Sequence, residues 1–504
     1  MYIPPEHPRT FGGGADDTTL VPAVAVALVV ALILILALPR KYMVWPVSFM
    51  LFLVPSTQQV LIGGVHLFAF RIIVLVGAMK MLLAKASSPT TAPSGRFSAV
   101  DRVFLCYSIC SACASIVLFA STDALVNQVG FLWDYIGGYF LFRYLIQDEE
   151  DIFRVIRCFA VVAMVVAACM LVERATLHNI FGQIGGDVSP EIRNGRVRCD
   201  GPFRHALTAG AFGATLMPLF LLGWKSGRGK ALAVIGLVSS ILITWNSNSS
   251  TSLFAFQAGL LALAFWPLRQ RMRVVRWVIA SALIGLQIVM KAPVWFLIAR
   301  VDLTGGSQSY HRAELVDQFV RHFWDWWLIG IKSTGLWGLG MWDTQNQFVL
   351  VGETGGLLAF ILFIAVISRS FASLGNARKV VQGQAEKEWF LWILGAALFS
   401  HLVAFFGVNY FDQSKFAWFA ALAMVAAATA PILEPALLGQ RQASASLKIS
   451  RSPQVLPSPA PVVAGKASRP TNPPPAKSPA ATPAAAVPDR RSRPTRAFQR
   501  LGDV

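Results

Sequence analysis

Long apolar segments, separated by short polar clusters, recur along the chain from residue 20 to residue 431. A helix needs about 20 apolar residues to cross the hydrocarbon core of a bilayer. We therefore expect thirteen spans, at 20–38, 42–56, 62–84, 103–120, 127–146, 155–172, 206–223, 231–246, 250–267, 276–292, 347–368, 388–407 and 414–431. Dividing 42–84 differently gives twelve. The pattern predicts an all-α polytopic membrane protein with an amphipathic helix in one outward-facing loop.

The charges predict the orientation of these spans. Only 14% of the 504 residues are charged, against about a quarter in soluble domains. The basic residues cluster in alternate loops, near residues 40, 96, 154, 228, 271 and 378. By the positive-inside rule this side is cytoplasmic. The polar segment 1–19 and the long loops 173–205 and 293–346 then lie outside. Because the net charge of +18 comes mainly from these loops and the tail, we expect no nucleic-acid partner.

The two ends of the chain differ from the middle. Residues 1–19 carry more acidic than basic residues, so we expect 20–38 to be a retained helix and not a cleaved signal peptide. Residues 432–504 are rich in Pro, Ala and Ser, and we expect a disordered, basic cytoplasmic tail. Its cations would favour the anionic inner leaflet. Cysteine spacing suggests no zinc site: five of the six lie in apolar stretches, and Cys199 stands alone in a polar loop.

The first outer loop contains a basic cluster that opposes the positive-inside trend. Its members are Arg193, Arg196, Arg198, Arg204 and His205. Guanidinium groups bind phosphate through paired, planar hydrogen bonds, so a lipid pyrophosphate headgroup is a candidate ligand. The alternative is that the arginines pair with Asp187, Glu191, Asp200 or ordinary lipid phosphates.

The second outer loop contains an amphipathic helix at 310–328. Its apolar face is formed by Leu315, Val316, Phe319, Val320, Phe323 and Trp327. We expect this helix to lie flat on the outer membrane surface, with Asp317 and Arg321 paired four residues apart. Arg312 differs from the other charges because it precedes the apolar stripe and adjoins His311.

A glycine-rich segment and a polar re-entry follow this helix. Gly330, Gly335, Gly338 and Gly340 allow the backbone to approach a ligand closely. Asp343, Gln345, Asn346 and Gln347 then stand where the chain re-enters the membrane. Glu353 follows about two turns inside the helix, and is either functional or bonded to a neighbouring helix.

Two further charges lie inside a predicted span. Asp134 and Arg143 are nine residues apart, which places them on roughly opposite faces of one helix. They are not expected to pair with each other, so each needs a partner of its own, in a structural or substrate-lining role.

Three segments together resemble the superfamily of bacterial O-antigen ligases and O-antigen polymerases. They are RVRCDGPFRHALTAGAFGATLMPLF, WNSNSSTSLFAFQAGLLAL, and YHRAELVDQF with the glycine stretch and DTQNQFVLVGETGGLLAFILF. The resemblance covers residues 155–430 and rests on the order and topology of degenerate motifs. It implies a multi-pass glycosyltransferase of the bacterial inner membrane that acts at the outer face.

The resemblance also implies a reaction. A glycan would pass from an undecaprenyl-pyrophosphate carrier to an acceptor hydroxyl, on lipid A core for a ligase or on another repeat unit for a polymerase. Arg198 and Arg312 would hold the pyrophosphate without a metal or cofactor, converging on one outward-facing cavity. Arg196, Arg204, His205, Gln345, Asn346 and Glu353 would contribute to substrate binding.

One departure from the family pattern affects the chemistry. Many ligases carry His-Asn where this chain has Gln345-Asn346, and glutamine cannot act as a general base. His311, His205 or Asp343 would have to replace it, and the loss favours a polymerase of surface or exocellular polysaccharide. The alternatives are a secondary transporter, although neither repeated halves nor paired broken helices are visible, and a non-catalytic component of a polysaccharide export complex.

Overall fold

The computed structural model describes residues 17–63, 65–87, 97–300 and 309–451, and these are overwhelmingly helical. Six helices in this part of the chain are long and apolar enough to cross a membrane. Three shorter apolar helices accompany them, at Pro22–Ala37, Lys230–Asn246 and Ser250–Ala264. The prediction of an all-α polytopic membrane protein is confirmed.

Most of the helices lie where the apolar runs place them. They are α1 (Pro22–Ala37), α2 (Val44–Leu53), α3 (Ala69–Ser87), α4 (Ala99–Phe119), α5 (Thr122–Leu132), α6 (Gly138–Leu145), α7 (Glu149–Thr176), α8 (Ala206–Lys225), α9 (Lys230–Asn246), α10 (Ser250–Ala264), α11 (Met272–Val289), α14 (Gln347–Val380), α15 (Ala385–Ala404) and α16 (Ser414–Arg451). Short helical turns η1 (Arg40–Tyr42) and η5 (Trp266–Arg271) precede α2 and α11.

The segment 42–84 differs from the prediction of two spans. α2 has ten residues, so it extends only about 15 Å. An antiparallel hairpin of β1 (Gln59–Ile62) and β2 (Val65–Phe68) follows, and α3 begins only at Ala69. Residues such as Val60 and Leu67 suit a strand as well as a membrane helix, and apolarity alone does not distinguish the two.

The tail boundary also differs from the prediction. We expected disorder from residue 432, but α16 continues through Pro431 and Pro435 to Arg451. Alanine and leucine in this segment favour helix, and each proline removes one backbone donor from it. The rest of the predicted tail, 452–504, lies outside the described residues.

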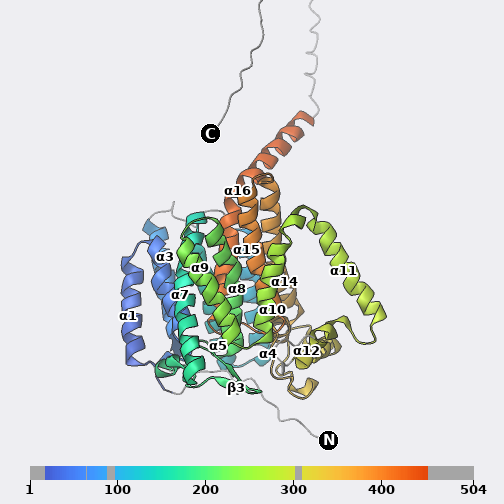
Figure 1. The fold of residues 1–504 in the computed structure, drawn as a ribbon. Coiled ribbons are helices and arrows are strands. Elements are labelled where there is room, and N and C mark those ends of the chain that lie inside the picture. Colours follow the sequence, from blue (N-terminus) through green and yellow to red (C-terminus); the bar gives the residue numbers. More distant parts are fainter. Residues whose placement is uncertain (1–16, 64, 88–96, 301–308, 452–504) are drawn as a thin grey trace, which may run out of the picture. The chain divides into compact units, whose positions relative to one another are not determined.

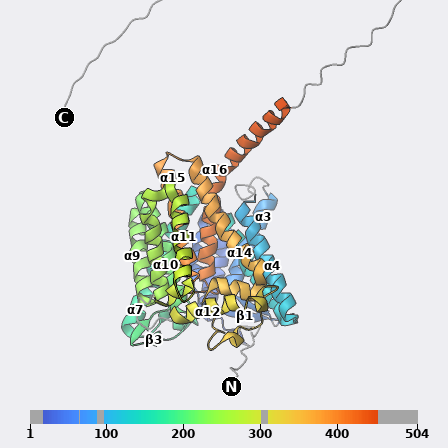
Figure 2. The ribbon, with the colours of Figure 1, turned by 90° about the vertical axis from the view of Figure 1, so that its right-hand side faces the viewer.

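Buried residues of α7, α8, α15 and α16 form much of the apolar core of the bundle. Small residues permit close helix packing in the membrane: a Cβ added to Gly236 of α9 would lie 2.7 Å from the ring of Phe220 in α8. α11 behaves differently. None of its residues is buried, its main contacts are with η5 and η6 (Val294–Arg300), and it stands at the edge of the bundle (Figures 1 and 2).

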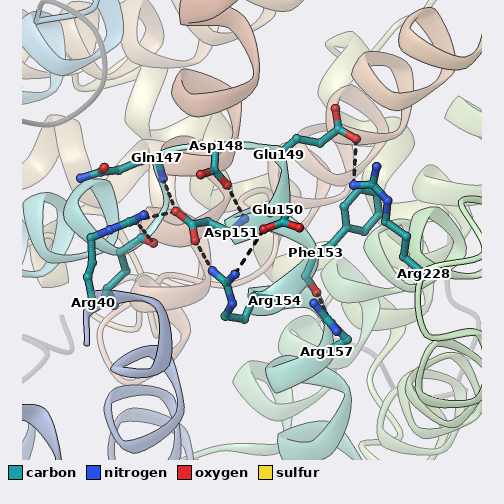
Figure 3. A network of polar contacts seen from close by, with 11 residues as sticks. Arg40, Gln147, Asp148, Glu149, Glu150, Asp151, Phe153, Arg154, Arg157 and Arg228 are labelled. Carbon is teal, nitrogen blue, oxygen red and sulfur yellow. Dashed lines mark hydrogen bonds and ion pairs between the residues drawn. The ribbon is translucent and has the colours of Figure 1, made fainter. Parts of the chain in front are cut away.

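The basic loops gather at one end of the bundle, as the alternation of charged loops predicts. Asp151 accepts hydrogen bonds from Arg40 at 2.5 Å and from Arg154 (Figure 3). Arg228 pairs with Glu149 at 3.2 Å in the same network.

The remaining basic loops are tied to the same end through α15. Arg269 pairs with Glu388 at 3.2 Å, and Arg378 donates a hydrogen bond to the backbone carbonyl of Arg269 at 2.5 Å. Lys225, at the end of α8, lies over the ring of Trp389 at 4.4 Å from its centroid. The loops after α1, α6, α8, α10 and α14 therefore share one end. Elements of the two long loops, β3 (Glu191–Arg193) and α12 (Ser309–Arg321), lie at the other end (Figures 1 and 2).

Asp134 and Arg143 have separate partners, which confirms that they do not pair with each other. Asp134 lies in a π-helical turn, η3 (Trp133–Gly137), between α5 and α6. It accepts hydrogen bonds from Arg71 at 2.9 Å and from Lys415 at 3.0 Å. Arg143 pairs at 3.0 Å with Asp101. Both carboxylates are buried, so each neutralises cations that would otherwise be unpaired in the bundle.

Candidate functional site

The first outer loop forms a hairpin that presents Arg198. Strands β3 (Glu191–Arg193) and β4 (Arg196–Arg198) pair in antiparallel register, with Glu191 opposite Arg198. Asn194 and Gly195 form the turn with φ of 51° and 70°, the backbone that two-residue hairpin turns require. Arg198 is 5% exposed, and its Nη1 donates to Glu191 Oε2 at 2.6 Å. The sequence left this pairing open as the alternative to phosphate binding.

The serine-rich turn between α9 and α10 anchors the second strand of this hairpin. Asn248 donates from its side chain to the carbonyl of Val197 at 2.7 Å. The N–H of Cys199 donates to the carbonyl of Asn246 at 3.0 Å. Two of the three segments that carry the family resemblance are thus in direct contact.

A buried carboxylate, Glu173, fixes the backbone that follows β4. It accepts hydrogen bonds from the N–H groups of Asp200 and Gly201, both at 3.0 Å. Asp200 itself is 6% exposed. Burial, the charges of Glu173 and Asp187, and a smaller contribution from Glu191 raise the pKa of Asp200 to about 8, against the opposing effect of Arg198. A carboxyl group with this pKa exchanges a proton near neutral pH, which suits acid–base chemistry.

The raised pKa of Asp200 predicts a pH-dependent stability. Because the folded protein binds this proton more tightly than the unfolded chain, the stabilisation is complete below pH 3.8 and is lost as pH rises through about 8. Each pKa unit corresponds to about 1.4 kcal/mol. We expect Asp200→Asn to be more stable than the wild type at pH 9 by several kcal/mol, and to lose this part of the pH dependence.

Thermal unfolding of the detergent-purified protein between pH 5 and pH 9 measures this effect. Asp123→Asn, at an exposed position in the first turn of α5, is the matched control. The charged groups that act on Asp200 are Glu173, Asp187, Glu191 and Arg198. The same slope of stability against pH in Asp200→Asn and in the wild type would contradict the assignment.

The second outer loop brings His311 and Arg312 to the re-entry segment. Both lie in the first turn of α12 (Ser309–Arg321), and Arg312 is 8% exposed. His311 Nε2 lies 3.2 Å from the backbone oxygen of Asp343. The carboxylate of Asp343 accepts a hydrogen bond from Gln345 at 2.6 Å. His311, Asp343 and Gln345 therefore form one cluster, although 32 residues separate the first two along the chain.

The loop helix differs from the predicted surface helix at 310–328. It breaks at His322 into α12 and α13 (Phe323–Trp326). Leu315, Phe319 and Trp326 pack in a small core with residues of the glycine stretch and α14, so the protein covers part of the predicted apolar face, while Val320 and Trp327 remain exposed. Trp324, in contrast, is 76% exposed. The expected pair of Asp317 and Arg321 is present, at 2.6 Å.

Asn346 has a structural position at the start of α14. Its side-chain oxygen accepts hydrogen bonds from the N–H groups of Phe348 and Val349, which caps the helix. Its amide nitrogen donates to the carbonyl of Phe406 at 3.3 Å. The resemblance assigns the side chain of Asn346 to substrate binding, but in the structure this side chain caps α14. Asn346 therefore holds the backbone where the chain re-enters the membrane.

Glu353 lies beside a break in α14. The backbone at Gly356 is non-helical, with φ 71° and ψ −174°. The residues of the second loop insert at this point: Ile331 N–H donates to the carbonyl of Glu353 at 2.8 Å, and Leu357 N–H donates to the carbonyl of Trp327 at 2.8 Å. These are the two groups that an unbroken helix would join to each other. The Glu353 carboxylate accepts a hydrogen bond from Thr344 at 2.8 Å.

The loop 405–413 connects these regions, and sequence reasoning gave it no role. Gln347 N–H donates to the carbonyl of Phe405, and Tyr410 N–H donates to the side chain of Gln347 at 2.7 Å. Gln413 donates to the carbonyl of Pro202 at 2.8 Å. A polar loop between two predicted spans was the available signal, but the residues that it contacts are distant in the sequence.

The other candidates of the first loop lie nearer to solvent. Arg196, Arg204 and His205 are exposed, and His205 packs edge-on against Phe411 of the loop 405–413, with 5.7 Å between ring centroids. In the described part of the chain, no group of three or more His, Cys, Asp or Glu side chains is placed to hold a metal ion.

Arg198 and Arg312 share an end of the bundle, where Figures 1 and 2 show β3 and α12. The charged neighbours that act on the pKa of Arg198 are Glu191, Arg193 and Asp200, and burial lowers that pKa. The structure therefore provides two regions, one around Arg198 and one around His311 and Arg312, which the loop 405–413 connects. The convergence of the two guanidinium groups on one cavity stays a prediction.

No family model matches the chain, and no curated protein matches it. The fold and the apolar helices define a multi-pass α-helical membrane protein.

Proposed function

We propose that the protein is a membrane glycosyltransferase that transfers or polymerises glycan from an undecaprenyl-pyrophosphate carrier at the outer face of the bacterial inner membrane. The observation that carries the proposal is the burial of two arginines, Arg198 and Arg312, at the end opposite the basic loops. The positive-inside rule does not account for cations there. Buried guanidinium groups fit an anionic ligand with several acceptor oxygens.

The proposed chemistry assigns distinct tasks to the two regions. When the glycosidic bond to the carrier breaks, the leaving pyrophosphate gains negative charge, which a fixed guanidinium stabilises. Arg198 and Arg312 supply this charge, while a general base removes the proton of the acceptor hydroxyl. His311 is our first choice of base, because the backbone carbonyl of Asp343 can only accept the hydrogen bond from Nε2, which leaves Nδ1 as the nitrogen that can accept a proton. His205 and Asp343 are the alternatives.

The replacement of a family histidine by Gln345 favours a polymerase over a ligase. The acceptor is then the terminal hydroxyl of another carrier-linked repeat unit and not lipid A core. Deletion of the gene followed by gel analysis of surface and secreted polysaccharide separates the two. Loss of long chains with single repeats retained indicates a polymerase, and complete chains that stay on the carrier indicate a ligase.

Substitution of the two arginines tests the proposal directly. We expect Arg198→Ala and Arg312→Ala each to lower the turnover of a purified lipid-pyrophosphate donor by about 10²–10³-fold, the loss typical of removing one transition-state donor. Arg→Lys should also be poorly tolerated at both sites, because a point charge loses the paired geometry.

Arg321→Ala is the matched control, because it removes the same charge from the same helix as Arg312. Arg321 is more exposed than Arg198 and Arg312, and the variant should keep most of the activity. Near-normal turnover in Arg198→Ala and Arg312→Ala, at equal protein levels, would end the assignment.

A secondary transporter is the second candidate, and the break in α14 favours it. Discontinuous helices often form the substrate sites of transporters, and α14 is interrupted at Gly356 beside the buried Glu353. Proteoliposomes loaded with lipid-linked glycan distinguish the two candidates. Movement of the intact carrier-linked glycan across the bilayer without new glycosidic bonds would support the transporter.

A further inference from the structure

The ion pair of the hairpin joins a buried cation to an exposed anion. The side chain of Arg198 is 6% exposed and that of Glu191 is 47% exposed, with 2.6 Å between Nη1 and Oε2. A buried guanidinium needs a counter-charge. Glu191 supplies it from the solvent side, which is also the side from which a dissolved or membrane-bound anion would arrive.

The two strands of the hairpin are held unequally. Bonds to Asn246 and Asn248 fix β4 to the turn between α9 and α10. The backbone of β3, in contrast, is paired with β4, and its side chain Ile192 is 59% exposed. The other oxygen of Glu191 pairs with Arg193 of the same strand at 3.2 Å, so the carboxylate can leave Arg198 and keep a cation beside it, while the guanidinium of Arg198 stays in place.

Arg198 has more hydrogen-bonding capacity than Glu191 uses. Its Nε is buried and has no hydrogen-bond partner among the described residues. The side-chain nitrogen of Asn246 is also buried and has no hydrogen-bond partner in the described part of the chain. The backbone carbonyl of Asn246 accepts a hydrogen bond from the N–H of Cys199, which follows Arg198. A phosphate group has enough oxygens to accept from both edges of a guanidinium, whereas one oxygen of Glu191 reaches only Nη1.

We propose that Glu191 is a built-in competitor at Arg198, whose carboxylate occupies the guanidinium until a phosphate-bearing anion displaces it. Glu191 then balances the charge of Arg198 when no anion is bound, and an anion must displace the Glu191 carboxylate in order to bind. The inference deepens the proposed function, which identifies the anion as the pyrophosphate of a lipid carrier. The exchange itself can be measured without any transfer of glycan.

The test uses the full-length protein in detergent and two probes, inorganic pyrophosphate and farnesyl diphosphate. We expect Glu191→Gln to tighten the binding of at least one probe by about tenfold, measured by isothermal titration calorimetry, which is equivalent to about 1.4 kcal/mol. Adding Arg198→Gln to Glu191→Gln should remove this gain. An unchanged melting temperature of Glu191→Gln would show that the fold is intact.

Asp187→Asn is the matched control, because it removes the same charge from an exposed position of the neighbouring loop. Equal tightening in Asp187→Asn and Glu191→Gln would overturn the proposal, since general repulsion would then explain both. Failure of both probes to bind the wild type and Glu191→Gln would also overturn it.

The two probes identify the source of the phosphate group. Tighter binding of both probes to Glu191→Gln means that the site recognises the phosphate group itself. Tighter binding of farnesyl diphosphate alone means that the site also needs the lipid. Either result supports Glu191 as the competitor. A tenfold gain in binding together with a complete lack of glycan transfer in the wild type would retain the competitor and reject the glycosyltransferase.

Discussion

Replacing Gly356 with alanine is expected to prevent the protein from accumulating in its folded form. Its φ of 71° and ψ of −174° lie in a region that is essentially restricted to glycine. An added Cβ would lie 2.6 Å from the carbonyl oxygen of Leu328, which belongs to the segment that inserts at the helix break. Relief of this contact would separate the segment from α14 and expose unpaired backbone groups, at a cost of about 3 kcal/mol or more.

Gly375→Ala is the control for this substitution. Gly375 lies in the same helix, and an added Cβ meets nothing within 4 Å. Alanine there should be neutral or stabilise by about 0.5–1 kcal/mol. Yield and melting temperature in detergent measure both variants. A Gly356→Ala protein with wild-type yield and melting temperature would show that the break in α14 is not required.

Asp134→Ala is expected to destabilise the protein strongly, because the carboxylate of Asp134 pairs with two cations. The substitution leaves Arg71 and Lys415 without the carboxylate that both contact at about 3 Å. Lys415 is 6% exposed, so its charge cannot be hydrated without rearrangement. Removing one partner of a buried pair typically costs about 3–5 kcal/mol, and we expect a loss of at least that size in the free energy of unfolding.

A second-site substitution separates lost charge balance from lost packing. Lys415→Met in the Asp134→Ala background removes one of the two uncompensated cations, and we expect it to restore part of the stability. Asp123→Ala, at an exposed position in α5, should change the melting temperature little. No recovery in the double variant would mean that the carboxylate acts through its shape or through Arg71 alone.

The sequence predicted the helices well because lipid imposes a strong constraint. A span must be long and apolar over its whole length, and this signal is local. The region 42–84 was predicted incorrectly because a short helix and a hairpin have the same composition as a span. The break at Gly356 depends on where Trp327 and Ile331 lie in space, which no local pattern contains.

The candidate site was predicted in its composition but not in its contacts. The sequence singled out Arg198, His311 and Asp343, and the structure places the latter two in contact. The sequence could not select Glu191 from the possible partners of Arg198, because the residue opposite Arg198 depends on the register of the hairpin. Asp200 was missed as a titrating group because its raised pKa comes from burial and from Glu173 in α7.

The loop 405–413 has a consequence for the synthesis of the protein. A ribosome makes α1 to α15 before this loop, and α16 follows it. The contacts to Pro202, Gln347 and Val54 therefore form only when most of the chain has already entered the membrane. Until the loop is made, the hairpin with Arg198 and the re-entry before α14 lack these contacts. Chains that terminate before residue 405 would therefore be inserted in the membrane, but their outer end would not be assembled.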